Sequence, residues 1–270
     1  MDKWRLIKNK SYDGAMNMAI DEAMTIAYNE GKSKPTLRFY TWNPYCLTMG
    51  YFQKSNEIDF KACKENNIDV VRRITGGRAV LHENELTYSI ITGEDNPLMD
   101  KSINLSYRFI SEGIVKGLNL YGIEVDELNK GERIGRDNLS AACFNAHASY
   151  EICINKKKIV GSAQNRKNGV ILQHGSIILN FDVNKLFNFI KSEDDSKKKR
   201  LINFTAKKAS GIENETNLKI DIYELEKCII QGLREQFNVD FIEEEISDYE
   251  INLANKLYKK YISDEHNKKR

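Results

Sequence analysis

Apolar residues recur at helical spacing in two long segments of the chain. The first runs from Met16 to Ala27, with apolar residues three and four positions apart, and Gly31 follows it. The second covers residues 102–121, and Gly122 lies just past its end. This spacing places the apolar side chains on one face, and glycine after the last turn is typical of a helix end. We predict an amphipathic helix in each segment.

Alternating or β-rich apolar segments dominate the middle of the chain and predict strands. Residues 36–42 and 46–52 flank Asn43-Pro44, a pair typical of a turn, so we expect a hairpin there. A short helix over residues 57–66 is predicted to lead into the next strand. Further strands are predicted at residues 68–74, 79–82, 85–91, 150–154, 158–163 and 170–179.

The last third of the chain carries signals for helix starts. Asp221 with Glu224 three residues on fits a capping box, in which the two side chains satisfy backbone N–H groups of the first turn. Ser247 with Glu250 repeats the pattern. The charge run at residues 191–200 is interpreted as a solvated loop or helix face. Strands followed by helices indicate an α+β domain with a mixed, largely antiparallel sheet.

Composition narrows the class of protein. The 270 residues carry 41 Lys and Arg against 39 Asp and Glu, a near balance that excludes a dedicated nucleic-acid binder. Hydrophobic residues make up 41%, enough for a full core. We find neither the roughly 18 consecutive apolar residues that a membrane span needs nor a signal-peptide pattern. We therefore expect a compact cytoplasmic protein with no membrane or nucleic-acid partner.

The five cysteines are an odd number and include no C-x-x-C pair, so we expect reduced thiols rather than a disulfide framework or a zinc site. Cys143 follows a polar loop just before the strands resume, where a thiol can be exposed enough to react as a nucleophile. A strand thiol such as Cys153 is expected to pack instead. From the residues alone, packing remains the alternative for Cys143 too.

A glycine pair interrupts the strands in the segment of residues 71–82. Gly76 and Gly77 would let backbone N–H groups approach a ligand, because no Cβ intervenes. Arg73 and Arg78 beside them could hold an anionic or polar group. A plain hairpin turn is the alternative, since the segment has neither the Walker nor the dinucleotide-binding pattern.

A lysine and a histidine in the later strands are further candidates. Lys158 opens a predicted strand whose following residues include Gly161, Ser162 and Ala163. A buried ammonium there could lower the pKa of a thiol and hold a carbonyl oxygen. His174 lies inside the next strand, and a lone strand histidine is more often structural than functional. We discount His82 in the same way.

In their order along the chain, these segments resemble the biotin/lipoate protein ligase superfamily, and within it the octanoyltransferase type of low-GC Gram-positive bacteria. The resemblance covers nearly the whole chain. It rests on residues 17–23, 37–44, 72–82, 85–89, 158–164 and 170–176.

The resemblance implies a mixed sheet flanked by helices, with a fatty-acyl chain in a tunnel near Gly76-Gly77. It implies one catalytic domain over residues 1–270, with an acyltransferase core at about 30–215 and a helical C-terminal part at 216–270 packed on it. We expect a monomer that needs no cofactor and no metal.

The resemblance also implies the reaction. An octanoyl group arrives as a thioester on acyl carrier protein, moves to Cys143, and passes to a lysine of the glycine cleavage H protein. Lys158 corresponds to the family's active-site lysine, and backbone N–H groups near Gly161–Ala163 are candidates for binding the oxyanion. The residues implied to bind substrate are Arg73, Gly76, Gly77, Arg78, His82, Gly161, Ser162, Ala163 and His174.

One departure and several alternatives remain. After the cysteine the chain has Asn145-Ala146-His147, where similar sequences more often show Asp-Ala-Pro, which puts the rigidity of the loop and its acceptor contact in doubt.

One alternative is an ATP-dependent lipoate–protein ligase, which uses no cysteine. Another is an amidotransferase that moves octanoyl from H protein to E2 subunits. The last is an acyl-binding module without turnover.

Overall fold

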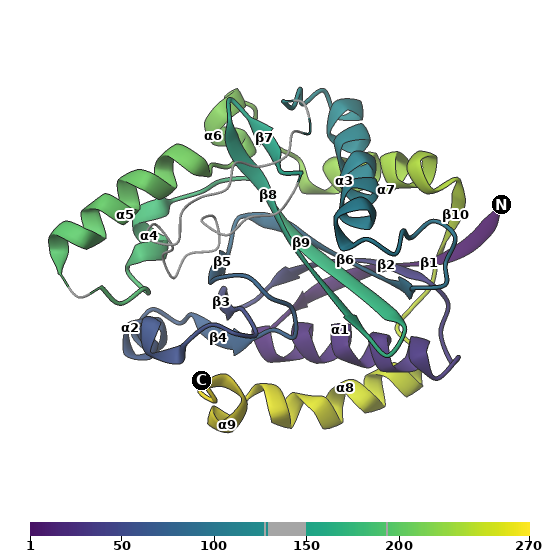
Figure 1. The fold of residues 1–270 in the computed structure, drawn as a ribbon, viewed down its shortest axis with the longest axis horizontal. Coiled ribbons are helices and arrows are strands. Elements are labelled where there is room, and N and C mark those ends of the chain that lie inside the picture. The colour runs from purple at the N-terminus through teal and green to yellow at the C-terminus, as the bar shows by residue number, and fades with distance from the viewer. Residues whose placement is uncertain (127, 129–149, 193) are drawn as a thin grey trace.

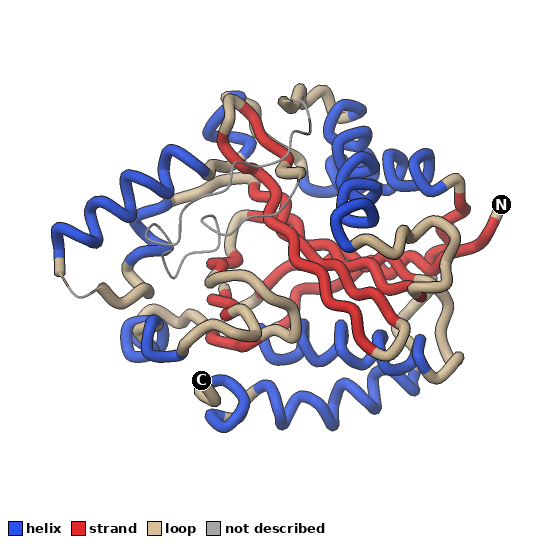
Figure 2. Tube along the Cα trace, viewed as in Figure 1, coloured by secondary structure: helices blue, strands red, loops and turns tan. Residues whose placement is uncertain are grey.

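A large mixed sheet forms the centre of the molecule in the computed structural model, which describes residues 1–126, 128, 150–192 and 194–270 (Figures 1 and 2). Its seven strands, in spatial order, are β10 (Val239–Glu243), β1 (Asp2–Tyr12), β2 (Thr36–Trp42), β6 (Glu85–Gly93), β9 (Val170–Ile178), β8 (Lys157–Lys167) and β7 (Ile152–Ile154). Strands β10, β1 and β2 run parallel, and each neighbouring pair from β2 to β7 is antiparallel. The prediction of a mixed, largely antiparallel sheet is confirmed.

A separate sheet of three strands carries the glycine pair. It has the order β4 (Asp69–Arg72), β3 (Cys46–Met49) and β5 (Val80–His82), so the glycines lie in the loop from β4 to β5. The predicted hairpin between β2 and β3 is wrong. Strand β2 pairs with β1 on one edge and with β6 on the other, which leaves β3 to pair with β4 and β5.

Helices cover both faces of the large sheet, with α1 and α8 on one side and α3 and α7 on the other (Figure 1). The helical segments are α1 (Gly14–Asn29), η1 (Ser55–Glu57), α2 (Phe60–Glu65), α3 (Ile103–Leu120), α4 (Val183–Phe187), α5 (Asp195–Lys208), α6 (Ile212–Thr216), α7 (Ile222–Phe237), α8 (Asp248–Tyr261) and α9 (Asp264–Asn267). The two long predicted helices correspond to α1 and α3. The capping box of Ser247 and Glu250 begins α8 as predicted. Asp221 caps α7 by accepting from the backbone N–H groups of Tyr223 and Glu224, but the predicted box with Glu224 is incomplete, because the Asp221 N–H donates to the Tyr121 hydroxyl.

Each face of the sheet has its own hydrophobic cluster. Ile114 of α3 and Leu233 of α7 belong to the cluster on one face, and Met24 of α1 and Ala254 of α8 belong to the other. Helices α3 and α7 pack closely because both present glycine at the crossing. A Cβ on Gly232 would lie 2.3 Å from the backbone nitrogen of Gly117.

Strands β1 and β10 were not predicted, and they pair the N-terminal segment with the segment between α7 and α8. Arg5 of β1 is buried and donates to both carboxylate oxygens of Glu250 in α8, at 2.7 and 3.0 Å. A charge that is paired by a residue this far along the chain gives no local sign of burial. The pairing of β1 with β10 thus escapes sequence patterns.

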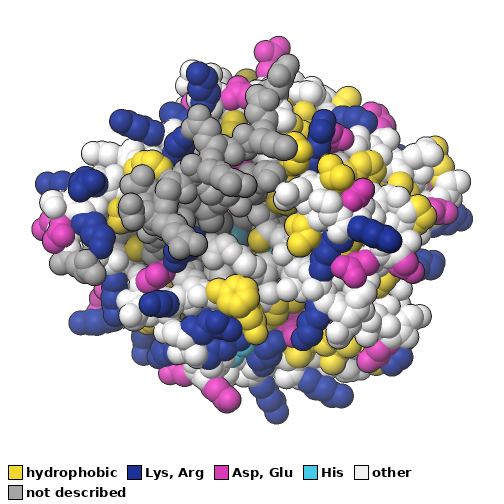
Figure 3. All heavy atoms as spheres, viewed as in Figure 1, with side chains coloured by type: hydrophobic (Ala, Val, Ile, Leu, Met, Phe, Trp, Pro, Cys, Tyr) yellow, Lys and Arg dark blue, Asp and Glu magenta, His cyan; other side chains and the backbone are white. Residues whose placement is uncertain are grey.

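The surface agrees with the near balance of charges. Over the described part of the face in Figure 3, basic and acidic side chains are interspersed. Among the described residues, no helix has the length and apolar character needed to cross a membrane.

Candidate active site

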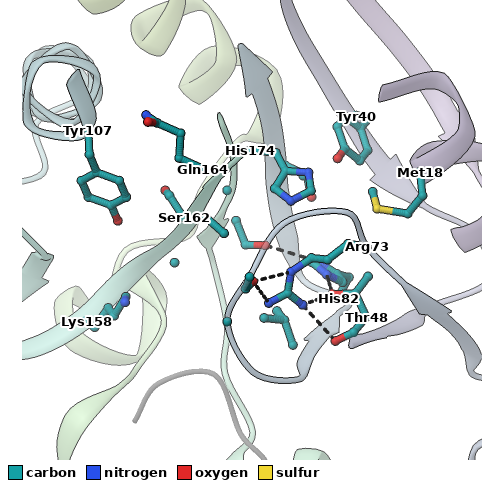
Figure 4. A pocket seen from close by; sticks show the side chains of 18 of the residues that line it. Met18, Tyr40, Thr48, Arg73, His82, Tyr107, Lys158, Ser162, Gln164 and His174 are labelled. Atoms are coloured by element: carbon teal, nitrogen blue, oxygen red, sulfur yellow. Dashed lines mark hydrogen bonds between the residues drawn. The ribbon is translucent and has the colours of Figure 1, made fainter. Parts of the chain in front are cut away.

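A cavity of about 320 Å³ lies where the glycine loop of the small sheet meets the β8 and β9 strands of the large one (Figure 4). Helix α1, the start of α3 and strand β2 complete its walls. Nine of the predicted site residues line it together: Arg73, Gly76, Gly77, His82, Lys158, Gly161, Ser162, Ala163 and His174. The fold therefore gathers the predicted segments around one space.

Arg78 is placed differently from the other predicted residues. Its side chain turns to Glu57, with Nη1 3.2 Å from Oε2, and it is not among the residues that line the cavity. Its carbonyl oxygen accepts a hydrogen bond from Arg73 Nη2 at 2.8 Å. These contacts support the glycine loop, and the predicted contact of Arg78 with substrate stays a prediction.

The apolar part of the lining was not predicted. In the sequence these residues fit ordinary core positions of a helix or strand, so no local signal distinguishes a side chain that faces a cavity from one that faces another side chain. They are Met18, Tyr40, Trp42, Val80, Ile103 and Tyr107.

Lys158 lies on β8 with its ammonium inside the protein. The residue is 3% exposed, and Nζ donates to Glu151 Oε1 at 3.0 Å. Cys153 of β7 is its partner in the ladder between the two strands. A cation at this depth can neutralise a developing negative charge more effectively than one in water, because the surrounding dielectric is low.

Strand β8 continues past the end of β7. In the described part of the chain, β7 pairs with β8 only as far as Val160, whereas β9 accompanies β8 to Lys167. Successive residues of an antiparallel strand direct their N–H groups alternately to its two sides. At least one N–H group within residues 161–163 is therefore directed away from β9, toward the edge beyond β7, where it can act as a donor.

Arg73 holds the glycine loop in shape. Its guanidinium donates to the carbonyl oxygens of Gly76, Arg78 and Thr48 and to Thr48 Oγ1, at 2.8 to 3.2 Å. Gly77 has φ +98°, and a Cβ on Gly50 would fall 1.9 Å from the Gly77 carbonyl oxygen, so the loop needs glycine at both places. Arg73 therefore stabilises the conformation of the loop, and its predicted contact with substrate stays a prediction.

His174 belongs to a buried polar chain. Its Nδ1 lies 3.2 Å from Asp21 Oδ2, and its Nε2 lies 2.6 Å from Thr75 Oγ1. Burial would raise the pKa of Asp21, but the charge of Arg38, 2.6 Å away, and the hydrogen bond from His174 outweigh it and lower that pKa. Asp21 is therefore ionised and accepts from Nδ1–H. Burial lowers the pKa of His174, so the ring is neutral and accepts from Thr75 at Nε2.

His82 forms a second pair with a buried carboxylate. Its Nδ1 lies 2.7 Å from Glu85 Oε1, and its Nε2 lies 2.8 Å from Thr48 Oγ1. The Trp42 ring stacks on the imidazole with centroids 4.1 Å apart. Both candidate histidines therefore have structural partners while each presents part of its ring to the cavity.

The predicted nucleophile, Cys143, lies outside the described residues. The four described cysteines have thiols whose pKa burial raises, to about 12 for Cys63 and about 11 for Cys153, and well above the usual value for Cys46. The pKa of Cys228 is raised as well, by burial and by the charge of a nearby glutamate. A thiol with a raised pKa holds little thiolate near neutral pH and reacts slowly. Among the described residues there is also no group of three or more metal-binding side chains.

A family model described as the lipoyl protein ligase A/B catalytic domain matches residues 13–234. The chain belongs to this family. It is 68% identical over 271 residues to octanoyltransferase LipM of Clostridioides difficile (strain 630), with all of both chains covered. It is 38% identical to octanoyltransferase LipM of Bacillus subtilis (strain 168), with 100% of this chain and 99% of the other covered.

Solved structures of the family share the fold. The bipartite lipoate protein ligase of Thermoplasma acidophilum aligns with a TM-score of 0.81 at 26% identity, covering 99% of this chain and 97% of its own. A lipoate-protein ligase A bound with ATP aligns with a TM-score of 0.79 at 27% identity, covering 99% of each chain. The resemblance inferred from the ordered motifs is confirmed, and the cavity described above belongs to a lipoyl protein ligase A/B catalytic domain.

Proposed function

We propose that this protein is an acyltransferase that moves an octanoyl group from octanoyl-acyl carrier protein to a lysine of the glycine cleavage H protein, through a thioester on Cys143. The observation that carries the proposal is the identity of 68%, over the full length of both chains, with a protein named octanoyltransferase LipM. The cavity supports it, because it combines an apolar lining with the ammonium of Lys158.

The first half-reaction exchanges one thioester for another. The Cys143 thiolate attacks the acyl carbonyl, a new C–S bond forms, and the carrier's thiolate leaves with the electron pair of the old bond. Lys158 and a backbone N–H group within residues 161–163 are the candidates for stabilising the oxyanion. An ammonium close to the thiol also lowers its pKa, which favours the thiolate.

The second half-reaction forms the amide. The acceptor's lysine attacks as a neutral amine, the C–N bond forms, and the Cys143 thiolate leaves and takes up the proton that the amine releases. Because a thioester is higher in energy than an amide, this step needs no ATP. The raised thiol pKa values of the four described cysteines support Cys143 as the nucleophile.

An ATP-dependent lipoate–protein ligase is the second candidate, because a structure with ATP bound shares this fold at a TM-score of 0.79. A ligase would activate a free acid as an adenylate and would form no acyl-enzyme. The two candidates therefore differ in their need for ATP and in their need for Cys143.

The test incubates the enzyme with octanoyl-acyl carrier protein while ATP is rigorously excluded. We expect an octanoyl adduct on the intact enzyme by mass spectrometry, and octanoylated H protein once the acceptor is added. Cys143→Ala should abolish both, whereas the matched control Cys153→Ala should keep both. Transfer that requires ATP, or an adduct that forms normally on Cys143→Ala, would contradict the proposal.

A further inference from the structure

Two opposite sides of the cavity differ in the side chains that line them. Figure 4 shows Lys158 and Met18 at opposite sides of the lining, with His174 between them. Ile103, at 54% exposure, and the exposed Gly77 lie where the cavity opens to the surface. Met18 and Tyr40 are each 2% exposed and lie on the side of the cavity opposite Lys158, which we call its closed end (Figure 4). A chain that enters with its carbonyl at Lys158 would therefore point its last carbons toward α1.

The length of the cavity suits a short acyl chain. Its lining crosses four neighbouring strands, β8, β9, β6 and β2, and three strand spacings amount to about 14 Å. An extended octanoyl group measures about 9 Å from its carbonyl to its last carbon, given C–C bonds of about 1.5 Å in a zigzag. The lysine side chain takes up part of the remaining distance. The last carbons then reach the side chains that close the cavity.

Two of the side chains at the closed end are held in place. The Tyr40 hydroxyl donates to Asp21 Oδ2 at 3.0 Å, and the Arg38 guanidinium lies over its ring at 3.9 Å. Trp42 Nε1 donates to Thr87 Oγ1 at 2.8 Å. Met18 instead presents an unbranched thioether, a side chain that fills the space left by more rigid neighbours. A shorter side chain at this position would leave additional space beside α1.

We propose that Met18 is the end wall that limits the acyl chain to about eight carbons. This inference rests on the proposed octanoyl transfer and names the residue that sets its chain-length specificity. Shortening Met18 opens space for further methylene groups of the substrate. Each methylene newly buried there favours the longer chain roughly fourfold, so two of them favour decanoyl over octanoyl by about tenfold or more.

The test is a competition between octanoyl- and decanoyl-acyl carrier protein at equal concentration, with H protein as acceptor and the two products measured by mass spectrometry. The product ratio gives the ratio of the kcat/KM values and is independent of the amount of folded enzyme. We expect Met18→Ala to raise the decanoyl to octanoyl ratio about tenfold, and Met18→Val to raise it less. Met24→Ala is the matched control, because Met24 is a fully buried methionine of the same helix that does not line the cavity.

The outcomes separate this inference from the proposed function. If the wild-type enzyme transfers octanoyl and neither Met18 variant changes the ratio, the end wall is overturned and the proposed function stands. A shift of equal size in Met24→Ala also overturns it, because general loosening of α1 would then be the cause. If the wild-type enzyme transfers no octanoyl group, the proposed function fails and the inference falls with it.

Discussion

Nδ1 of His174 in β9 donates a hydrogen bond to Oδ2 of Asp21 in α1 at 3.2 Å. The carboxylate also accepts from Arg38 at 2.6 Å and from Ser89 at 3.0 Å, so one side chain of the helix joins three strands of the large sheet. The other ring nitrogen of His174, Nε2, is hydrogen-bonded to the hydroxyl of Thr75, the residue before the glycine pair. This contact thus connects the packing of α1 on the sheet with the shape of the loop that borders the cavity.

Asp21→Asn should destabilise the protein strongly. Both Asp21 and Arg38 are almost completely buried, and neutralising the carboxylate leaves the guanidinium without a counter-charge. Breaking a buried pair in this way costs about 3–5 kcal/mol, which urea denaturation would measure as a fall in the free energy of unfolding. Glu30→Gln, which breaks the exposed pair of Glu30 with Lys32, is the control and should leave the unfolding midpoint nearly unchanged. Equal effects of the two substitutions would contradict the assigned burial.

The stability of the protein should fall as the pH is lowered from about 7 to 5. Burial lowers the pKa of His174 and of His266 below the usual 6.5, so these rings take up protons at a lower pH in the folded state than in the unfolded chain. The unfolded state then binds more protons and gains stability, by at most about 1.4 kcal/mol per pH unit for each histidine. Urea titrations at several pH values should show a smaller slope for His174→Gln. An unchanged slope would mean that the pKa of His174 is the same in the folded and unfolded states, which would contradict its lowering by burial.

Lys158→Met should reduce octanoyl transfer while the fold is kept. The substitution keeps an unbranched side chain of similar length but removes the charge that we assign to the oxyanion, and loss of one such donor costs about 100- to 1000-fold in rate. Lys157→Met is the control, because Lys157 is the neighbouring residue and pairs with Glu215 at 2.8 Å. Single-turnover transfer from octanoyl-acyl carrier protein provides the measurement. A Lys158→Met enzyme with the control's rate would remove Lys158 from the mechanism.

Gly175→Ala should destabilise the protein, whereas Gly76→Ala should leave its stability nearly unchanged. A Cβ on Gly175 would lie 2.3 Å from Ser162 Oγ and 2.7 Å from Tyr88 Cε1, so the strands must move apart at a cost of about 1–3 kcal/mol. A Cβ on Gly76 meets nothing within 4 Å. Gly76→Ala should therefore fold normally, and it should raise the KM for the acyl donor if substrate passes this residue. Thermal unfolding with steady-state kinetics measures both, and a destabilised Gly76→Ala would contradict the open space there.

The pattern of apolar and polar residues predicted those helices and strands in which buried positions recur at a regular spacing. The apolar period of α1 and α3, the strands β6 and β9, and the capping box of Ser247 all follow from residues close together in sequence. Strand β1 did not follow, because the charge of Arg5 is matched by two carboxylates far along the chain, those of Glu244 and Glu250. The false hairpin of β2 and β3 has a related cause, since a strand's choice of partner depends on which edges the rest of the sheet leaves open.

The sequence by itself determined the family, because its motifs occur in a fixed order, and it determined nine of the residues that meet at the cavity. Only the tertiary structure decided what those residues do there. It gave Arg73 carbonyl partners, turned Arg78 to Glu57, and placed Met18 at the closed end opposite Lys158. The physical reason is that motif and period report which residues are buried or polar, whereas a side chain's role depends on the atoms that distant segments bring within a few ångströms of it.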